Sequence, residues 1–420
     1  MIIDSIEVKN FKSIKHTEVN FNSLNILIGK NAAGKSNFLE LFQFLNDVES
    51  QGIEDAIQLR GGIEYFRNTK IADTEDFELT INFVRREKDP KRFRVTNDEK
   101  IGISDPISTE YNIVIEFDED SYNISKEEIT NQRIIIDREK DNEKTRVTHE
   151  LYREEGHLKR EKYGYDDEIS EYSEEHLAPM MSEREIGKNQ SMLSLGIPIR
   201  GRLGGIRQLT DLTIYDIDPV QIKQGTTLKG KRELESNGNN LPLVLKEIVS
   251  SSDEKEKFLN LIGDILPFIK DWETDTLRDK SVFLKILEEF EDQDQEYLPA
   301  DLVSDGTINA IAIIIILYFE NKRIAMVEEP ERNMHPALIS KIVRMMEDVS
   351  ENTNKQVFTT THNVELIKNA STDDILFVNR DDRGFTEINR PSNDEHIRQF
   401  LEQGMGLEEL YVKNILESEL

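Results

Sequence analysis

The segment GKNAAGKS, residues 29–36, has the residue types and the spacing of a phosphate-binding loop. It follows the apolar run LNILI and precedes a helical pattern, which is the context that such a loop requires. Gly29 and Gly34 let the backbone turn its N–H groups toward phosphate oxygens, and the helix N-terminus adds its dipole. Lys35 is expected to reach the β- and γ-phosphates of ATP, and Ser36 to ligate Mg²⁺. Two further residues of this region are expected to contact the nucleotide, Asn31 and Asn37.

A phosphate loop needs an acidic partner for the metal ion, usually at the end of another core strand. The segment IAMVEEPERNMHP, residues 324–336, is an apolar run that ends in two glutamates. Buried carboxylates are costly unless they are paired or bind a metal, so their position calls for a function. Glu328 is expected to complete the Mg²⁺ site, and Glu329 to act as the general base that activates the attacking water.

Two more polar patches follow or precede apolar segments. The run QVFTTTHN predicts a strand that ends at His362, and neighbouring parallel strands converge on a ligand crevice, so we expect His362 to sense the γ-phosphate. The segment LVSDGTINAI, residues 302–311, places a polar turn at the start of an apolar helix, which is a ready anion site. Taken alone, this turn is merely a good helix start.

These residues need a core that holds them, and two regions have the pattern of one. Residues 1–84 read strand, strand, helix, strand, and residues 298–390 alternate helix and strand with apolar runs typical of a parallel sheet. The sequence therefore predicts an α/β fold of the P-loop NTPase type. Between and after these regions we expect a charged insertion of antiparallel strands at 85–204, a mostly helical subdomain at 205–297 and a helical tail at 391–420.

Composition limits the function classes. The 420 residues include 53 Lys and Arg and 83 Asp and Glu, a net charge of −30, so contact with nucleic acid would need a local basic patch. The absence of cysteine excludes disulfides and fits a reducing cytoplasm. The longest apolar run, Ala310 to Phe319, is too short to span a bilayer, and the N-terminus alternates like a strand, so we expect a cytoplasmic protein without a membrane partner.

In order and spacing, the four patches resemble the ABC-type ATPases of the RecF/SMC/OLD branch. SDGT is similar to that branch's signature motif, VEEPE to its Walker B motif and TTHN to its switch-histidine loop. The stretch from NFKSIKHTEV to the phosphate loop also looks like the opening of RecF-like and OLD-family proteins. The closest resemblance is to stand-alone bacterial ATPases of phage-defence operons, and it covers residues 1–84 and 205–420.

The resemblance implies a dimer, or a higher homo-oligomer, that closes around ATP. In ABC-type ATPases the signature turn of one subunit caps the nucleotide of the other, so Ser304, Asp305 and Gly306 would contact ATP in trans. His335 would lie near the partner subunit, and Gln58 is the nearest candidate for the glutamine of a Q-loop. OLD-family nucleases carry a C-terminal TOPRIM domain, for which the tail has no room, so a nuclease of TOPRIM or HNH type is expected on a separate chain.

Four functions remain open on the sequence alone. The first is a regulatory ATPase that senses or binds DNA or RNA and controls a partner effector in antiphage defence. The second is a RecF- or SMC-like clamp for DNA repair or chromosome maintenance, for which the candidate basic patches are 85–94, 200–207 and 229–232. The third is a nuclease with metals on the acidic stretch 288–297, although this stretch reads as a solvated helix face. A membrane transporter subunit is the fourth.

Overall fold

The computed structural model describes residues 1–71, 75–86, 93–95, 101–118, 121–137, 143–164, 185–195, 212–227, 233–278, 281–288 and 297–416. The chain forms two compact units, each assembled from segments that are distant in the sequence. The first unit contains Met1–Asn22, Ala32–Leu212 and Val378–Asn389, and the second contains Ser23–Asn31, Thr213–Phe377 and Arg390–Leu420. The five consecutive segments predicted above follow the order of the chain and remain a prediction about its domains.

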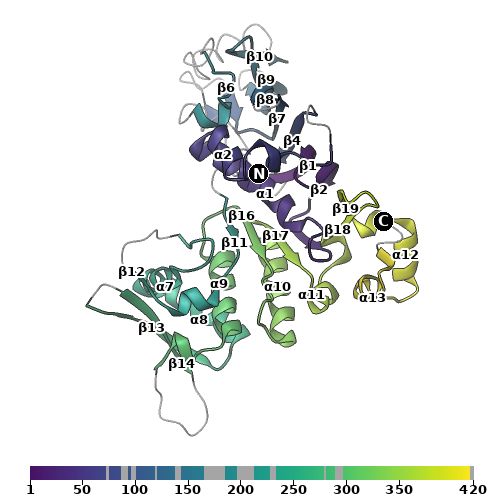
Figure 1. Ribbon diagram of the computed structural model, residues 1–420. Coiled ribbons are helices and arrows are strands. Elements are labelled where there is room, and N and C mark those ends of the chain that lie inside the picture. The colour runs from purple at the N-terminus through teal and green to yellow at the C-terminus, as the bar shows by residue number, and fades with distance from the viewer. Residues whose placement is uncertain are drawn as a thin grey trace. The chain divides into compact units, whose positions relative to one another are not determined.

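The first unit is built on an antiparallel sheet with the order β10-β9-β8-β7-β4-β1-β2 (Figure 1). Strand β4 shows why it forms, because every second residue from Phe77 to Phe83 is buried and the residues between them are half-buried. The predicted antiparallel strands of the charged insertion are confirmed. The strands are β1 (Ile2–Phe11), β2 (Ile14–Asn20), β4 (Phe77–Val84), β5 (Phe93–Val95), β6 (Ile101–Ser104), β7 (Ser108–Phe117), β8 (Tyr122–Asp137), β9 (Glu143–Glu154) and β10 (His157–Tyr163).

Helix α1 (Lys35–Gln51) carries the end of the phosphate loop and belongs to this unit. Its ring Phe44 packs against Phe66 and Phe77 with ring centroids 4.8 and 5.8 Å apart. The guanidinium of Arg60 is buried against Asp47 of α1, at 2.9 Å between Nη2 and Oδ2. These contacts hold α1 and therefore the position of Lys35. The other helices here are α2 (Ile53–Gln58), α3 (Ile63–Phe66) and the 3-10 turn η1 (Met192–Leu195), which contacts α1.

The second unit contains a parallel sheet in which β11, β16, β17, β3 and β18 lie in that order. Its strands are β3 (Leu24–Ile28), β11 (Ile214–Tyr215), β16 (Ile324–Glu328), β17 (Gln356–Thr361) and the part of β18 (Ile375–Arg380) up to Phe377. The rest of β18 and β19 (Thr386–Asn389) belong to the first unit. All residues of β3 and β17 are buried, as in sheets covered on both faces.

Helices pack on this sheet and form a large apolar core with it. Helix α9 (Asp305–Tyr318) is buried around its whole circumference from Gly306 to Leu317, which explains its unbroken apolar sequence. Helices α10 (Pro336–Asn352) and α11 (Val364–Asn369) alternate with the strands, so the predicted succession of helix and strand from 298 to 390 is confirmed (Figure 1).

One part of the second unit adds a sheet to the elements expected from the sequence. The subdomain predicted to be mostly helical contains α6 (Pro219–Lys223), α7 (Leu241–Ser250) and α8 (Ser252–Ile265), but also an antiparallel sheet of β12 (Thr226–Thr227), β13 (Ile269–Thr276), β14 (Ser281–Glu288) and β15 (Tyr297–Pro299). Strand β14 lies in the segment that was expected to be mostly helical. Val282, Leu284 and Ile286 are buried at every second position, which is a strand period.

The acidic stretch 288–297 falls outside the described residues at 289–296. Its first residue, Glu288, ends β14 and not a helix, so the prediction of a solvated helix face was wrong there. The tail from 391 is helical as predicted, with α12 (Glu395–Glu402) and α13 (Leu407–Val412). Short 3-10 turns complete the unit, η3 (Ala300–Leu302), η4 (Thr372–Asp374) and η5 (Pro391–Asn393). Within the described part of the chain, no helix is long and apolar enough to cross a membrane.

Candidate active site

Three of the predicted motifs meet at one edge of the parallel sheet of the second unit. Strand β17 lies between β16 and β3, and its register pairs Thr360 with Glu328 on one side and with Leu27 on the other. The residues that leave this edge are therefore Glu329, His362 and the first residue of the phosphate loop, Gly29. Ligands of open parallel sheets bind outside the carboxyl ends of the strands, and this edge has that position.

Glu329 is held in a strained backbone conformation. Its φ angle is 43°, in the left-handed region that non-glycine residues rarely adopt, and such strain clusters at functional sites. The carboxylate Oε1 lies 2.8 Å from Nδ1 of His362, and Oε2 lies 3.2 Å from Nη2 of Arg332. The predicted base and the predicted sensor are thus brought into contact.

The contact constrains the chemistry of His362. Because a carboxylate only accepts hydrogen bonds, Nδ1 of His362 must be the donor to Glu329. A neutral imidazole has a single N–H, so Nε2 can donate to a phosphate only when both ring nitrogens carry protons or when the contact with Glu329 is released. The side chain of His362 is half-exposed, which leaves it able to turn.

A third glutamate of the same motif is buried. Glu331 is 5% exposed and accepts a hydrogen bond from the hydroxyl of Thr361, the last residue of β17. Burial raises the pKa of Glu331, and the charge of Glu329 acts in the same direction. Glu331 therefore fixes the loop after β16 to the end of β17, while Glu328 and Glu329 stand at the sheet edge.

The phosphate loop has the backbone conformation that its glycines permit. Gly29 and Gly34 have φ angles of 156° and 117°, and Ala32 between them has a φ angle of 63°. A Cβ atom at Gly34 would lie 2.2 Å from Oγ1 of Thr386, so Gly34 is required for space as well as for its torsion angle. Lys35 and Ser36 are the first two residues of α1, and Asn31 and Ser36 are exposed.

A hydrogen-bond chain within the first unit supports the loop from outside. The Nδ2 group of Asn37 donates to Oγ of Ser13 at 2.8 Å, Ser13 contacts Oγ1 of Thr386 at 2.8 Å, and Thr386 donates to the carbonyl of Ala33 at 2.8 Å. The amide of Asn37, predicted to contact the nucleotide, therefore also holds the β1–β2 turn.

Arg380 adds a second support for the loop. Its Nε donates to the carbonyl of Ala32 at 2.7 Å, and its Nη1 donates to the carbonyl of Gly384 at 2.6 Å. Thr386 and Arg380 were missed by sequence reasoning, because no local pattern relates them to a loop about 350 positions earlier.

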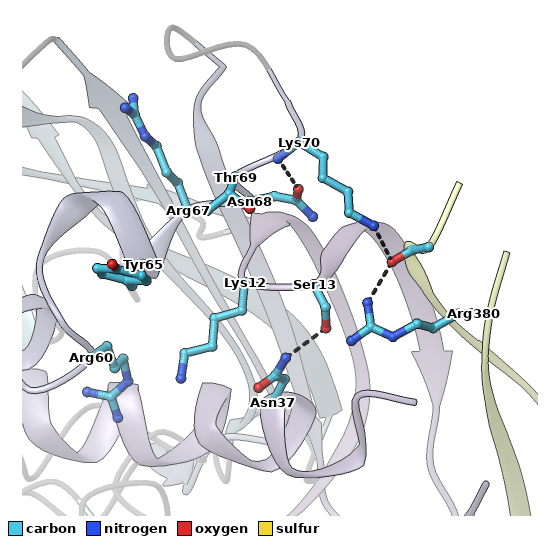
Figure 2. Close-up of a pocket in the computed structure, with 11 residues that line it drawn as sticks. Lys12, Ser13, Asn37, Arg60, Tyr65, Arg67, Asn68, Thr69, Lys70 and Arg380 are labelled. Atoms are coloured by element: carbon cyan, nitrogen blue, oxygen red, sulfur yellow. Dashed lines mark hydrogen bonds between the residues drawn. The ribbon is translucent and has the colours of Figure 1, made fainter. Parts of the chain in front are cut away.

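Beside α1 lies a basic pocket with a volume of about 490 Å³ (Figure 2). No acidic side chain is among its eleven lining residues, of which five are cationic. The ammonium of Lys70 and the guanidinium of Arg380 both donate to the carbonyl of Gly384 there, so backbone carbonyls, which carry no net charge, are their partners (Figure 2). The cationic residues are Lys12, Arg60, Arg67, Lys70 and Arg380. Lys12 and Arg60 are paired with Glu40 and Asp47 of α1, so the attraction of the pocket for an anionic ligand rests on Lys70 and Arg380.

The turn SDGT begins α9, and the side chains of Ser304 and Asp305 have partners in the same chain. Ser304 is the N-cap and accepts a hydrogen bond from the backbone N–H of Thr307 at 3.1 Å. Asp305 forms an ion pair with Lys223 of α6. A Cβ atom at Gly306 would lie 2.4 Å from the carbonyl oxygen of Asn333, so glycine lets α9 approach the loop after β16.

His335 caps α10, accepting a hydrogen bond at Nδ1 from the N–H of Ala337 at 3.2 Å. Gln58 is exposed at the end of α2. The basic patches 200–207 and 229–232 lie outside the described residues, as does most of the patch 85–94.

A hydroxyl and a carboxylate, from Ser36 and Glu328, are the oxygen ligands that Mg²⁺ prefers. In the described ranges, no group of three or more His, Asp or Glu side chains could hold a metal ion. Mg²⁺ commonly takes one or two protein oxygens and completes its shell with phosphate oxygens and water, so the hydroxyl of Ser36 and the carboxylate of Glu328 are each of a type that suits Mg²⁺.

A parallel sheet with a phosphate loop after one strand and two glutamates after another defines the class of P-loop ATPases. Residues 1–367 match the family model described as "AAA ATPase domain". The chain belongs to this ATPase family.

Short segments match curated relatives. The chain is 49% identical over 45 residues to an "ATP/GTP phosphatase" of Helicobacter pylori, covering 10% of this chain and 12% of the relative. It is 48% identical over 46 residues to the DNA replication and repair protein RecF of Lactobacillus acidophilus, covering 11% of this chain and 12% of that protein. The chain thus spans about an eighth of the length of these relatives.

Solved structures of SMC head domains are also similar. A head bound to the C-winged helix domain of ScpA is 14% identical, with a TM-score of 0.47, over 93% of this chain and 98% of that chain. The SMC head domain from Thermotoga maritima is 12% identical, with a TM-score of 0.41, over 93% of this chain and 99% of that chain.

Proposed function

We propose that the protein hydrolyses ATP in a Mg²⁺-dependent reaction at the sheet edge that carries Glu329. The observation that supports this most is the contact of the Glu329 carboxylate with His362, on a strained backbone, at the edge where β3 leads into the phosphate loop. A carboxylate so oriented can take a proton from water, which is the step that a general base performs.

The roles of the other residues follow from their types. The backbone amides of residues 29–36 and the ammonium of Lys35 bind the phosphates, and the positive end of α1 adds to their attraction. Ser36 and Glu328 would hold Mg²⁺, which would neutralise charge on the phosphates. Glu329 accepts the proton of the water, and His362 turns toward the γ-phosphate.

The basic pocket is proposed to hold the part of the nucleotide beyond the transferred phosphate. It is lined by Asn37, the residue after Ser36, so it lies beside the end of the phosphate loop. The half-exposed amide of Asn37 and the hydroxyl of Ser13 offer polar groups there, and the guanidinium of Arg380 offers positive charge.

The signature turn is proposed to act in trans. Ser304, Asp305 and Gly306 would contact the ATP of a second subunit, with His335 near the same partner, in a homodimer or higher oligomer. ATP then supplies contacts that exist only in the closed dimer, and hydrolysis removes them.

We assign the output to control of a separate effector chain, a nuclease of TOPRIM or HNH type, in cytoplasmic antiphage defence that senses DNA or RNA. The alternative is a clamp that binds DNA directly, and the short segments shared with RecF are the observation in its favour. Salt-dependent DNA binding by the purified chain, with release of counterions, would support the clamp.

The ATPase proposal is tested with Lys35→Ala and Glu329→Gln. Lys35→Ala is expected to abolish phosphate release, and Glu329→Gln to retain ATP binding while hydrolysis falls by about 100-fold or more, since general bases contribute rates of that order. Size-exclusion chromatography with ATP and Mg²⁺ should show a dimer that persists longer for Glu329→Gln than for the natural chain. Hydrolysis retained by Lys35→Ala would show that the site is elsewhere, and a monomer for both chains would exclude the composite site.

A further inference from the structure

Glu329, the candidate general base, has a second side-chain partner that was not among the predicted site residues. Arg332 contacts Oε2 of Glu329 with Nη2 at 3.2 Å and contacts Oδ1 of Asp216 with Nη1 at 2.8 Å. Asp216 follows β11, the strand beside β16 in the parallel sheet. The three side chains therefore form a chain from one strand end to the next, Asp216 to Arg332 to Glu329.

The energetics of these contacts argue against a role in stability. The side chains of Asp216 and Arg332 are 59% and 41% exposed, and exposed ion pairs contribute only about 0–1 kcal/mol to folding. Burial lowers the pKa of Arg332, but the carboxylates of Asp216 and Glu329 outweigh it and raise that pKa. The contacts of Arg332 can instead orient the carboxylate of Glu329, because a guanidinium group fixes the orientation of the carboxylates that it binds.

Under the proposed function, the carboxylate of Glu329 needs a partner that keeps its orientation. His362 is its other partner, and a neutral imidazole cannot donate to Glu329 and to the γ-phosphate at the same time. When His362 turns to the phosphate, Oε1 of Glu329 is released to accept the proton of water. Among the contacts that the structure describes, the one from Arg332 to Oε2 then still orients the carboxylate.

The backbone supports this arrangement. The N–H of Arg332 donates to the carbonyl of Glu329 at 3.0 Å, so a tight turn places the guanidinium beside the carboxylate three residues earlier. The N–H of Glu329 donates to the carbonyl of Thr360 at 3.0 Å and ties the turn to β17. The backbone of Glu329 is thereby fixed relative to the sheet edge, and Arg332 fixes its carboxylate.

We propose that Arg332 and Asp216 are positioning residues for the general base: Arg332 holds the Glu329 carboxylate in its catalytic orientation, and Asp216 holds Arg332. The proposal rests on the proposed ATPase function and adds the residues that direct its base. Neither residue is expected to contact ATP.

The test is a mutant cycle of Arg332→Gln, Asp216→Asn and the double variant, measured by steady-state phosphate release and by binding of a non-hydrolysable ATP analogue. Arg332→Gln should lower kcat by about 10- to 100-fold, as misplaced catalytic groups do, with analogue affinity and KM changed less than about twofold. Asp216→Asn should lower kcat by less, and the double variant should match Arg332→Gln, because Asp216 acts only through Arg332. Arg332→Lys should restore part of kcat.

A matched control is the exposed pair Lys413 and Glu409 of α13, whose charges are 3.5 Å apart. Lys413→Gln should leave kcat unchanged. The proposal is overturned if Arg332→Gln keeps the natural kcat, if it lowers analogue affinity in proportion to kcat, or if the two single losses multiply in the double variant. If Lys35→Ala abolishes hydrolysis, those results leave the proposed ATPase function intact. If Lys35→Ala still hydrolyses ATP, both the proposed function and the positioning role of Arg332 and Asp216 are excluded.

Discussion

The support of the phosphate loop by Thr386 yields a quantitative prediction. The hydrogen-bond chain runs in one direction, from the amide of Asn37 through Ser13 and Thr386 to the carbonyl of Ala33. Replacing Thr386 by Val keeps the shape of the side chain and removes its hydroxyl. Ala33 then loses the donor to its carbonyl, and Ser13 loses an acceptor.

The magnitude follows from burial. Thr386 is 1% exposed and Ala33 is 6% exposed, so the carbonyl of Ala33 cannot recruit water freely. A buried acceptor left without its donor costs about 1–3 kcal/mol. Ser13 is half-buried and can turn to solvent, so we assign the cost to Ala33 alone. If about 1.4 kcal/mol of it is lost from the loop conformation that binds ATP, affinity falls about tenfold.

The assay is titration of Thr386→Val with a fluorescent ATP analogue, alongside urea unfolding followed by circular dichroism. Thr386→Ser is the matched control, because it keeps the hydroxyl and removes one methyl group, which costs about 1 kcal/mol of burial but should leave affinity near the natural value. Natural affinity in Thr386→Val, or an equal loss in both variants, would refute the reasoning that the hydroxyl holds the loop.

Three further outcomes follow from buried contacts. Asp47→Ala should lower the free energy of unfolding by about 3–5 kcal/mol in urea titrations, because it leaves Arg60 charged and buried. Gly306→Ala should cost about 1–3 kcal/mol in the same titrations, since its Cβ would press on the carbonyl of Asn333. Glu127 of β8 is fully buried and accepts hydrogen bonds from the hydroxyls of Tyr111 and Ser191. Burial raises the pKa of Glu127, so its contribution to stability is present below the ordinary carboxyl pKa and is lost as pH rises through the raised value. Glu127→Gln should flatten the dependence of the urea midpoint on pH across that range, and an unchanged pH dependence would contradict this.

Local pattern predicted the elements that carry the chemistry. The apolar runs that end at Glu328 and His362 form adjacent parallel strands, and their order in the chain is enough to place their ends together. Strand β14 lies in the segment 205–297 that was expected to be mostly helical, although its apolar residues alternate with the period of a strand.

The supporting residues could not be predicted in the same way. Thr386 and Arg380 reach the phosphate loop, and Asp216 reaches Arg332, across 116 or more positions of sequence. Such contacts depend on sheet order, and nothing in the local spacing of these residues encodes it. The motifs show which groups do chemistry, whereas the fold decides which groups direct them.

The signature turn illustrates how one residue can serve both the fold and a partner. Ser304 Oγ accepts the N–H of Thr307, and the two hydroxyls are 2.7 Å apart. If Thr307 donates its hydroxyl proton to Ser304, the Ser304 proton is available to a phosphate in trans, so the helix-start and signature interpretations are compatible. Ser304→Asp separates them: it keeps the N-cap but has no donor and carries a charge that repels phosphate.

Ser304→Asp should therefore unfold at the natural urea midpoint and fail to dimerise with ATP, whereas Ser304→Ala should lose about 1 kcal/mol of stability as well. Dimer formation is measured by size-exclusion chromatography with ATP and Mg²⁺ in the Glu329→Gln background, because slow hydrolysis there does not dissociate the dimer. A dimer formed by Ser304→Asp would mean that the turn acts only as the start of α9, since a carboxylate facing the phosphate of a partner's ATP would repel it.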